Sequence, residues 1–382
     1  MDATDPEQRI QAIDVTRGGV MVLMALDHVR VYSGLPSGGP MAGIFFTRWI
    51  THFCAPTFVF LAGIGAFLHG RKLGNKRPLA NYLLTRGLLL VVLELTVIRF
   101  AWTFNFDFSH FVLAGIIWML GWCMVMLALL IWLPMRAVAV LGLTVIFFQQ
   151  IFHVLPRALP ALLRNSVGGI WEFFYPAGLQ RWPGISILYV LVPWIGVMAA
   201  GYGFGTIMIR EPAERRRFCL RIGLSTTALF LVVGSLVLLS FPESDDTRPA
   251  LFRLLDQKKY PASQLFLMMT LGPVIALLPL AESTHGWFAR ALATFGRVPL
   301  FYYLLHIVVI HVTALMVYLL REGAVHSDWF ATAPFVSVPA EARWGLPLLY
   351  LVLAMDVTIL YVACRWFARV KTRHPNGWLR YL

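Results

Sequence analysis

The sequence is poor in charge and in cysteine. Only 13% of its 382 residues are charged, against about 25% in a typical soluble chain. Hydrophobic residues make up 59% of the sequence, and its mean hydropathy is +0.72. The four cysteines form no CxxC pair and have no Cys/His ligand spacing. The composition therefore predicts a membrane protein, with neither a disulfide framework nor a bound metal.

Motifs for nucleotides, secretion and nucleic acids are also missing. No GxGxxG or Walker pattern supplies a backbone cradle for phosphates, so no nucleotide-binding domain is predicted. The polar N-terminal stretch lacks the basic region of a signal peptide, and no cleavable signal is expected. The formal net charge is +13. Its distribution fits membrane topology better than a nucleic-acid surface, so no nucleic-acid partner is expected.

Long apolar segments follow one another along the chain. A transmembrane helix needs about 20 predominantly apolar residues. Segments of this kind are predicted at residues 13–33, 52–70, 81–101, 111–133, 136–154, 185–208, 221–241, 263–281, 298–320 and 345–366. The predicted fold is an all-α polytopic membrane protein, a single bundle of about ten transmembrane helices that forms one domain over residues 1–382. Residues 155–184, which prolines and glycines interrupt, are expected to form an interfacial helix and a loop.

Lysine and arginine are unevenly distributed between the connecting segments. They are more numerous in the segments that face the cytoplasm if the N-terminus is inside, for example at Arg71, Lys72, Lys76 and Arg77 and in the run 215–217. Because cytoplasmic loops carry an excess of Lys and Arg, both termini are expected in the cytoplasm. The chain is expected to be a multi-pass protein of the plasma membrane, surrounded by membrane lipids.

Ionisable side chains are concentrated in the first two predicted spans. A charged residue at the centre of a membrane helix costs at least about 2.5–3.5 kcal/mol, so such residues indicate function. Asp14 and Arg17 share a helix face near the predicted cytoplasmic end and can pair; a purely structural ion pair is an equal alternative. Asp27 and His28 follow about 15 Å further along the helix axis, in its outer half. His52 begins the next span on the same side.

These residue types predict acid–base chemistry in the outer half of the bundle. One acid and two imidazoles converge there, and imidazole accepts a proton near neutral pH. Hydrogen bonding between helices is the alternative role for Asp27 and His28. In the ninth predicted span Tyr302 and His306 are four residues apart and share a face, which His311 does not. Function and helix packing are equal alternatives for His306.

The pattern Asp14-x-x-Arg17-Gly18, followed by LDHVR and HFCAPTFVFLAG, resembles the heparan-alpha-glucosaminide N-acetyltransferase catalytic-domain family, in its bacterial branch. The similarity continues through YPASQLFLMMTLGP (260–273), GRVPLFYYLLHI (296–307) and CRWFARVK (364–371). It implies a ten-span acyltransferase of the bacterial inner membrane. Such an enzyme would take an acetyl group from cytoplasmic acetyl-CoA and deliver it to a sugar, glycan or lipid-linked acceptor across the membrane. A homodimer is left open.

The resemblance also implies roles for individual residues. His52 matches the family's catalytic histidine, and Asp27 and His28 are expected to assist it. His28 stands where lysosomal members have Asn, and Phe53-Cys54-Ala55 replaces their Trp-Asn-Gly, so a glucosamine acceptor is not implied. Acyl transfer from a thioester needs a base or a nucleophile, and histidine serves as either.

The donor also needs cations for its phosphates. Arg17, Arg86 and Arg297 are the expected phosphate-binding residues, and the same substrate site is expected to include Asp14, Tyr302 and His306. For the basic residues between 71 and 77 a positive-inside loop is favoured. A secondary transporter is the alternative class, because it too needs buried His, Asp and Arg, but the paired half-chain repeats of that class are not evident.

Overall fold

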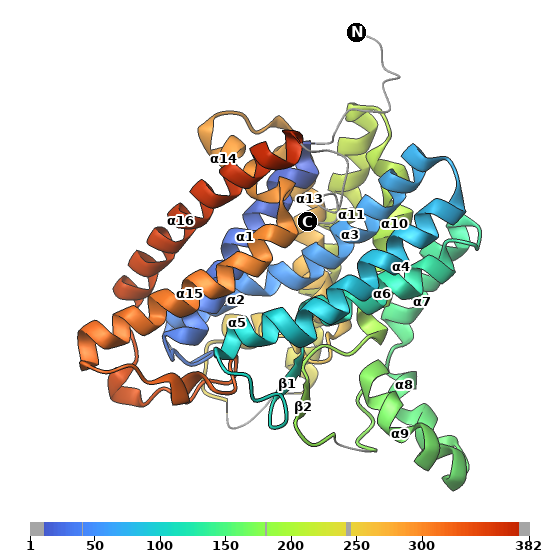
Figure 1. The fold of residues 1–382 in the computed structure, drawn as a ribbon. Coiled ribbons are helices and arrows are strands. Elements are labelled where there is room, and N and C mark those ends of the chain that lie inside the picture. The colour runs from blue at the N-terminus through green and yellow to red at the C-terminus, as the bar shows by residue number, and fades with distance from the viewer. Residues whose placement is uncertain (1–10, 40, 180–181, 242–245, 374–382) are drawn as a thin grey trace.

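The computed structural model describes residues 11–39, 41–179, 182–241 and 246–373. These residues are mostly helical, as predicted (Figure 1). Two short strands, β1 (Val112–Ala114) and β2 (Ile185–Ile187), form a small parallel sheet in which Val112 pairs with Ile185. The all-α prediction is therefore confirmed apart from this sheet.

The helices follow the predicted segments closely. Their bounds are α1 (Gln11–Tyr32), α2 (Ala42–Trp49), α3 (Cys54–Leu73), α4 (Lys76–Leu93), α5 (Arg99–Thr103), α6 (Ile116–Leu130), α7 (Met135–Phe148), α8 (Ile151–Val154), α9 (Ala161–Phe174), α10 (Val192–Met208), α11 (Pro212–Ser240), α12 (Ala250–Leu255), α13 (Gln264–Ser283), α14 (Trp287–Arg297), α15 (Pro299–Glu322) and α16 (Leu346–Arg373). A 3-10 turn, η1 (Ile50–Phe53), joins α2 to α3, and a π-helical turn, η2 (Glu94–Ile98), joins α4 to α5. Helix α14 lies where the sequence predicted only a connecting segment.

Five helical segments are long and apolar enough to cross a membrane. They are Ala42–Leu73, which joins α2 to α3, and helices α11, α13, α15 and α16. Helix α7 and residues 151–158 would make a sixth, although they meet at a bend of 63°. Helix α6 and helix α10 are shorter, and α1 and α4 carry several charged side chains. The expected count of ten spans is therefore not confirmed. Residues 1–10 and 374–382, on which the placement of the termini depends, lie outside the described residues.

Close backbone contacts hold the centre of the bundle together. Gly63 of α3 and Gly201 of α10 face each other's helix so closely that a Cβ on either would collide with a backbone carbonyl, that of Met198 or of Phe60. The glycines at 201 and 205 thus serve close helix packing, as small residues do between membrane helices. Helix α1 lies in the interior, among α3, α13, α14, α15 and α16 (Figure 1).

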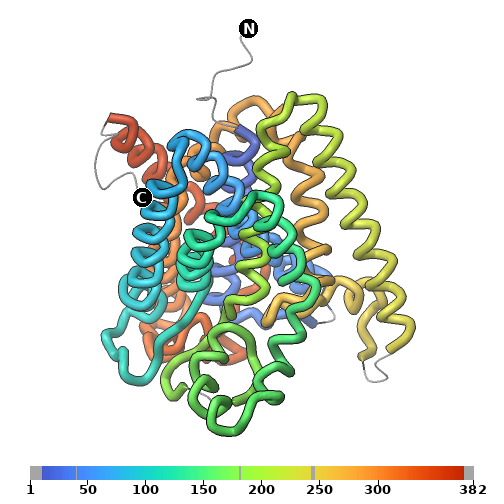
Figure 2. Tube along the Cα trace, turned by 90° about the vertical axis from the view of Figure 1, so that its right-hand side faces the viewer, coloured from blue at the N-terminus to red at the C-terminus, as the bar shows by residue number. Residues whose placement is uncertain are grey.

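The two ends of α1 define the two ends of the molecule. Its N-terminal end lies beside α14 and the C-terminal end of α16, at the top of Figure 1. Its C-terminal end lies toward α2, α5 and the small sheet, at the bottom of that view. Figure 2 shows α11, in yellow-green, at the edge of the bundle next to α13. Residues 161–174 are helical, as predicted for the stretch that was not expected to span.

Candidate functional site

A large cavity opens near the N-terminal end of α1. Its volume is about 1580 Å³, and its walls come chiefly from α1, α3, α4, α6, α15 and α16, with the ends of α10 and α14. Ligand sites for drug-sized molecules usually measure about 300–1,000 Å³. The cavity therefore has room for a ligand larger than a simple metabolite.

Basic side chains dominate the polar part of the cavity wall. They are Arg17, Arg71, Lys72, Arg86, Arg210, Arg215, Arg297, Arg365, Arg369 and Lys371. Three acidic side chains line the same space, those of Asp14, Glu211 and Glu282. The cavity consequently carries a marked excess of positive charge and suits a ligand with several negative charges.

The predicted pairing of Asp14 with Arg17 is confirmed. Arg17 Nη1 lies 3.7 Å from Asp14 Oδ1 and also donates to the carbonyl of Gly296, at 3.1 Å. Gly296 packs directly on the backbone of α1 at Asp14, because it has no Cβ. The contact between α1 and the end of α14 thus places Arg297 at the cavity wall, next to the ion pair.

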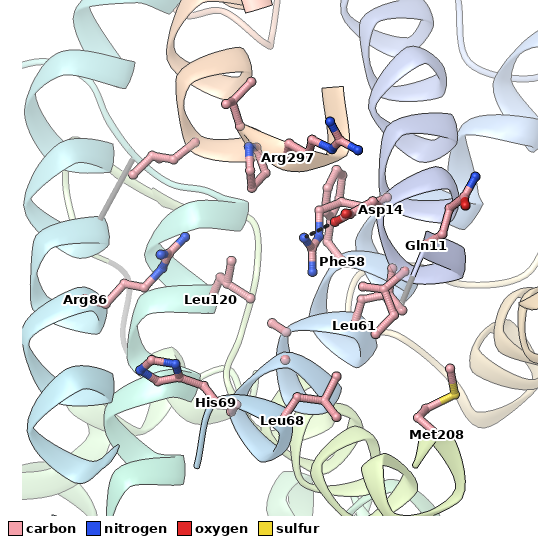
Figure 3. Close-up of a pocket in the computed structure, with 18 of the residues that line it drawn as sticks. Gln11, Asp14, Phe58, Leu61, Leu68, His69, Arg86, Leu120, Met208 and Arg297 are labelled. Carbon is pink, nitrogen blue, oxygen red and sulfur yellow. Dashed lines mark ion pairs between the residues drawn. The ribbon is translucent and has the colours of Figure 1, made fainter. Parts of the chain in front are cut away.

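A second wall of the cavity comes from α3 and α4. Arg86 Nη1 donates to the Tyr82 hydroxyl at 3.0 Å, and the Tyr82 ring contacts that of His69 at a tilt of 47°, with centroids 4.3 Å apart. Figure 3 shows Arg86 and His69 beside the same space, with Asp14 and Arg297 on its other side. Sequence reasoning identified Arg86 but neither Tyr82 nor His69. Tyr82 could have been predicted, because it lies four residues before Arg86 on one helix and residues at that spacing are neighbours.

The inner end of the cavity lies near two histidines, the half-buried His28 and the buried His306. Met24 of α1 and Tyr303 of α15 line it there. His28 lies one turn deeper than Met24 on α1, and the Tyr303 ring meets the ring of His306 edge-on, with centroids 5.1 Å apart. Neither histidine lines the cavity itself.

Hydrogen bonding fixes the proton positions of this pair. His306 Nδ1 lies 2.6 Å from the Tyr303 carbonyl and must donate to it, so in the neutral ring His306 Nε2 is an acceptor. His28 Nδ1 lies 2.8 Å from that Nε2 and must therefore be the donor. This assignment leaves the lone pair of His28 on Nε2. The ring of His28 is also held against Trp102, with centroids 4.7 Å apart.

Asp27 faces arginines rather than imidazoles. Its Oδ1 accepts from Arg30 Nη2 and from Arg48 Nη1, both at 3.2 Å. Among the hydrogen bonds of the described residues, none joins Asp27 to His28 or His52, which differs from the expectation that the acid assists an imidazole. Arg48 lies on α2, between the first two predicted spans.

His52 is buried near this acid–arginine group. It is 7% exposed, and its ring meets Phe266 edge-on with centroids 5.5 Å apart. Its Nδ1 has no hydrogen-bond partner among the described residues. The charges closest to it include those of Arg48, Lys259 and Asp27. His52 does not line the large cavity.

Other buried polar residues have structural partners. The Glu94 side chain, carried on the π-helical turn, accepts from Ile117 N at 3.1 Å at the start of α6. Asp356 accepts from Thr313 Oγ1 at 2.8 Å. His311 stacks on Phe104, away from the His306 face, as predicted. Within the described ranges, no group of three or more His, Cys, Asp or Glu side chains is placed to hold a metal ion.

Comparison with known proteins gives one family. The family profile described as "Heparan-alpha-glucosaminide N-acetyltransferase, catalytic" matches residues 9–241, more than half of the chain. The matched part includes His28, His52 and the α3 and α4 walls of the cavity, whereas α14, α15 and His306 follow it. No curated protein matches the chain.

Proposed function

The chain belongs to the heparan-alpha-glucosaminide N-acetyltransferase catalytic family, and on that premise we propose that it is a membrane acyltransferase that uses acetyl-CoA bound in the cation-lined cavity. One observation carries this proposal. The cavity that suits a polyanionic donor ends at Met24 and Tyr303, and the Tyr303 ring contacts one of a pair of hydrogen-bonded histidines. We further propose the cytoplasmic side for the donor, and a sugar, glycan or lipid-linked acceptor on the outer side of a bacterial inner membrane.

The chemistry of the donor supports this assignment. Coenzyme A is a large ligand with phosphates at one end and a thioester at the other. Charge-assisted hydrogen bonds from arginine are the usual means of holding phosphates. Arg17, Arg86 and Arg297 line the cavity, and in this proposal they hold the phosphates together with the surface lysines and arginines. The thioester then reaches the inner end, at Met24 and Tyr303.

Transfer needs one new bond, one broken bond and one proton acceptor. The amine or hydroxyl of the acceptor attacks the thioester carbonyl carbon, a C–N or C–O bond forms, and the C–S bond breaks. The proton of the attacking group goes to His28 Nε2, whose lone pair is available in the assigned tautomer, and is passed to the departing thiolate. His306 acts as a positioning residue, because it fixes that tautomer through His28 Nδ1.

His52 stays in the proposal as a second imidazole. We assign it to the acceptor side, where it is suited to hydrogen-bond the attacking group; its unpaired Nδ1 and its charged surroundings support this assignment. The sequence-based prediction makes His52 the base, whereas the hydrogen-bonded pair favours His28. The two assignments make different predictions for single variants.

The test is acetyl transfer by protein reconstituted in liposomes with labelled acetyl-CoA on the cavity side. We expect His28→Ala to lower the chemical rate by about 10²–10⁴, the usual contribution of a positioned base. Donor affinity should be unchanged in this variant, and His52→Ala should weaken acceptor affinity more than it lowers the maximal rate. His285→Ala is the control, since His285 is an exposed histidine outside the cavity.

Two outcomes would contradict these roles. If His52→Ala abolishes turnover while His28→Ala leaves it intact, the base is His52. Transport of labelled donor without acetyl transfer or hydrolysis by the wild type would instead favour a transporter and reject the acyltransferase.

A further inference from the structure

A second group of cations lies toward the opposite end of α1 from the cavity. Asp27 follows Asp14 by thirteen residues, about 20 Å along the helix axis at 1.5 Å per residue. Around Asp27 stand Arg30, Arg48 and Lys259, from α1, α2 and the segment before α13. Arg30 and Lys259 are buried, and the side chain of Arg48 is 15% exposed. We call these four side chains the outer cluster.

The charges of the outer cluster do not balance. The single carboxylate of Asp27 is shared by Arg30 and Arg48. Arg48 Nη1 also donates to Thr51 Oγ1 at 2.9 Å. Arg30 and Arg48 are bonded to Asp27, and Lys259 adds a third positive charge close enough to act on its carboxylate. A buried charge without a counter-charge is costly, so a surplus of this kind is expected to attract an anion.

Lys259 carries that surplus most clearly. The residue is only 8% exposed, and its ammonium lies over two aromatic rings, 5.2 Å from the centroid of Tyr260 and 5.9 Å from that of Tyr189. Within the described part of the chain, no carboxylate, hydroxyl or carbonyl accepts a hydrogen bond from Lys259 Nζ. Ring contacts stabilise an ammonium but supply no oxygen acceptor for its three N–H donors, which are therefore available to a ligand.

The pKa of the neighbouring Tyr260 phenol reflects the same positive surroundings. Burial raises the pKa of Tyr260, but the charges of Lys259 and Arg48 and a hydrogen bond with Tyr189 outweigh it, so that this pKa lies below its usual value. Tyr260 is also 37% exposed, and it therefore connects the outer cluster to the outside. His52, with its unpaired Nδ1, is buried within reach of the Arg48 and Lys259 charges.

We infer that Arg48, Lys259 and Tyr260 form a binding site for a phosphate group carried by the acceptor. The inference rests on the proposed function, because only a transferase has an acceptor to place there. Arginine and lysine together suit a phosphate. Its oxygens can accept two parallel N–H bonds from the guanidinium and also interact with the compact positive charge of the ammonium. The phosphate would satisfy Lys259 Nζ and hold the acceptor beside His52. The acceptor class is thus a phosphorylated sugar, either soluble or linked to a lipid.

The test measures phosphate binding to the full chain in nanodiscs of zwitterionic phosphatidylcholine. Pyrophosphate and glucose 1-phosphate are titrated with excess free coenzyme A present, which occupies the donor cavity, and with glucose and potassium chloride as neutral and ionic controls. The variants are Lys259→Gln and, as matched control, Lys258→Gln, whose side chain is exposed one residue earlier. A further variant, Tyr260→Phe, keeps the ring beneath Lys259 but removes the hydroxyl.

We expect saturable binding of both phosphates to the wild type and to Lys258→Gln. Loss of a charge-assisted hydrogen bond should weaken it at least about tenfold in Lys259→Gln, and loss of the phenol should weaken it about two- to tenfold in Tyr260→Phe. Thermal unfolding of each variant without ligand separates loss of the site from loss of the fold.

Equal affinity in the wild type, Lys259→Gln and Tyr260→Phe would overturn the site. Phosphatidylglycerol in the nanodisc could abolish pyrophosphate binding, with glucose 1-phosphate unable to displace that lipid. In that case the cluster holds a lipid headgroup, and the acceptor assignment is wrong. Binding of coenzyme A is measured in parallel. Its absence would refute the donor site, whereas its presence without Lys259-dependent phosphate binding would refute this inference alone.

Discussion

At the scale of single residues, the neighbours of each histidine decide what it can do. In the neutral ring, His306 Nδ1 donates to a backbone carbonyl and Nε2 accepts from His28. Neither nitrogen is therefore free to accept a proton from a substrate. His28 keeps one nitrogen for chemistry, and His52 keeps an unpaired Nδ1. His311 is sandwiched between aromatic rings, including that of Phe104, and serves packing. His28 is half-buried and the other three are buried, and each of the four imidazoles has a different set of neighbours.

Single cations of the cavity should control donor affinity. Arg297→Gln keeps most of the side chain but removes its charge, and we expect the dissociation constant for acetyl-CoA to rise by about tenfold or more, since a hydrogen bond to a charged group is worth about 1.5–3 kcal/mol. The maximal rate should change less. Isothermal titration in detergent, beside steady-state kinetics, measures both quantities.

Arg136→Gln is the matched control for this variant. Arg136 is exposed near the start of α7 and does not line the cavity. Equal donor affinity in the wild type and in Arg297→Gln would remove Arg297 from the coenzyme site.

At the scale of elements, the packing of α14 on α1 is what builds the cavity wall. Gly18 has no room for a Cβ, which would collide with the backbone carbonyl of Leu292, and Gly296 meets the Asp14 backbone in the same way. These two contacts set the position of Arg297 and of the Arg17 bond to the Gly296 carbonyl. A short amphipathic helix thus supplies a charge that neither α1 nor α15 could place there.

The prediction at this scale compares two adjacent glycines. Gly18→Ala forces α14 away from α1, and we expect it to lower stability by about 1–3 kcal/mol, the usual cost of overpacking. Donor affinity should fall with it, because Arg297 moves. Gly19→Ala is the control, since a Cβ there meets nothing within 4 Å. Thermal unfolding and acetyl-CoA binding measure the two effects, and similar behaviour of the two variants would refute the close contact.

At the scale of the whole molecule, the two charged regions lie toward opposite ends of one helix. The cavity with its excess of cations adjoins the N-terminal half of α1, the outer cluster adjoins the C-terminal half, and His28 of the histidine pair directly follows Asp27 in that second half. This order suits a donor and an acceptor that arrive from opposite sides. It gives a physical basis to the proposal of transfer across the membrane.

That arrangement predicts which positions can be labelled from each side. Single cysteines at positions 76 and 373 should react with an impermeant maleimide from the cytoplasm, and one at position 107, in the loop before β1, from outside. The four native cysteines are buried and should contribute little background. Position 76 reacting from outside in intact cells would reverse the orientation and with it the side of the donor.

The sequence by itself determined the class of the protein and much of its helix pattern. Apolar runs of spanning length placed a helix in each of the ten predicted segments, because length and hydropathy are local properties. The same local spacing predicted the Asp14–Arg17 pair and the shared face of Tyr302 and His306, which a helical period fixes. The family resemblance, which short motifs around Asp14 and His52 carried, was confirmed over residues 9–241.

Only the tertiary structure decided which polar residues meet. His28 and His306 are 278 residues apart in the sequence, and no local period relates them. From the sequence, Asp27 was expected to assist an imidazole, but helix α2 carries Arg48, which pairs with it. The contact of α14 with α1 likewise determines the position of Arg297. Lys259 reached the outer cluster from a loop. The physical reason is the same in each case: burial leaves polar groups to be satisfied by whichever helix packs beside them, and that packing is a property of the whole bundle.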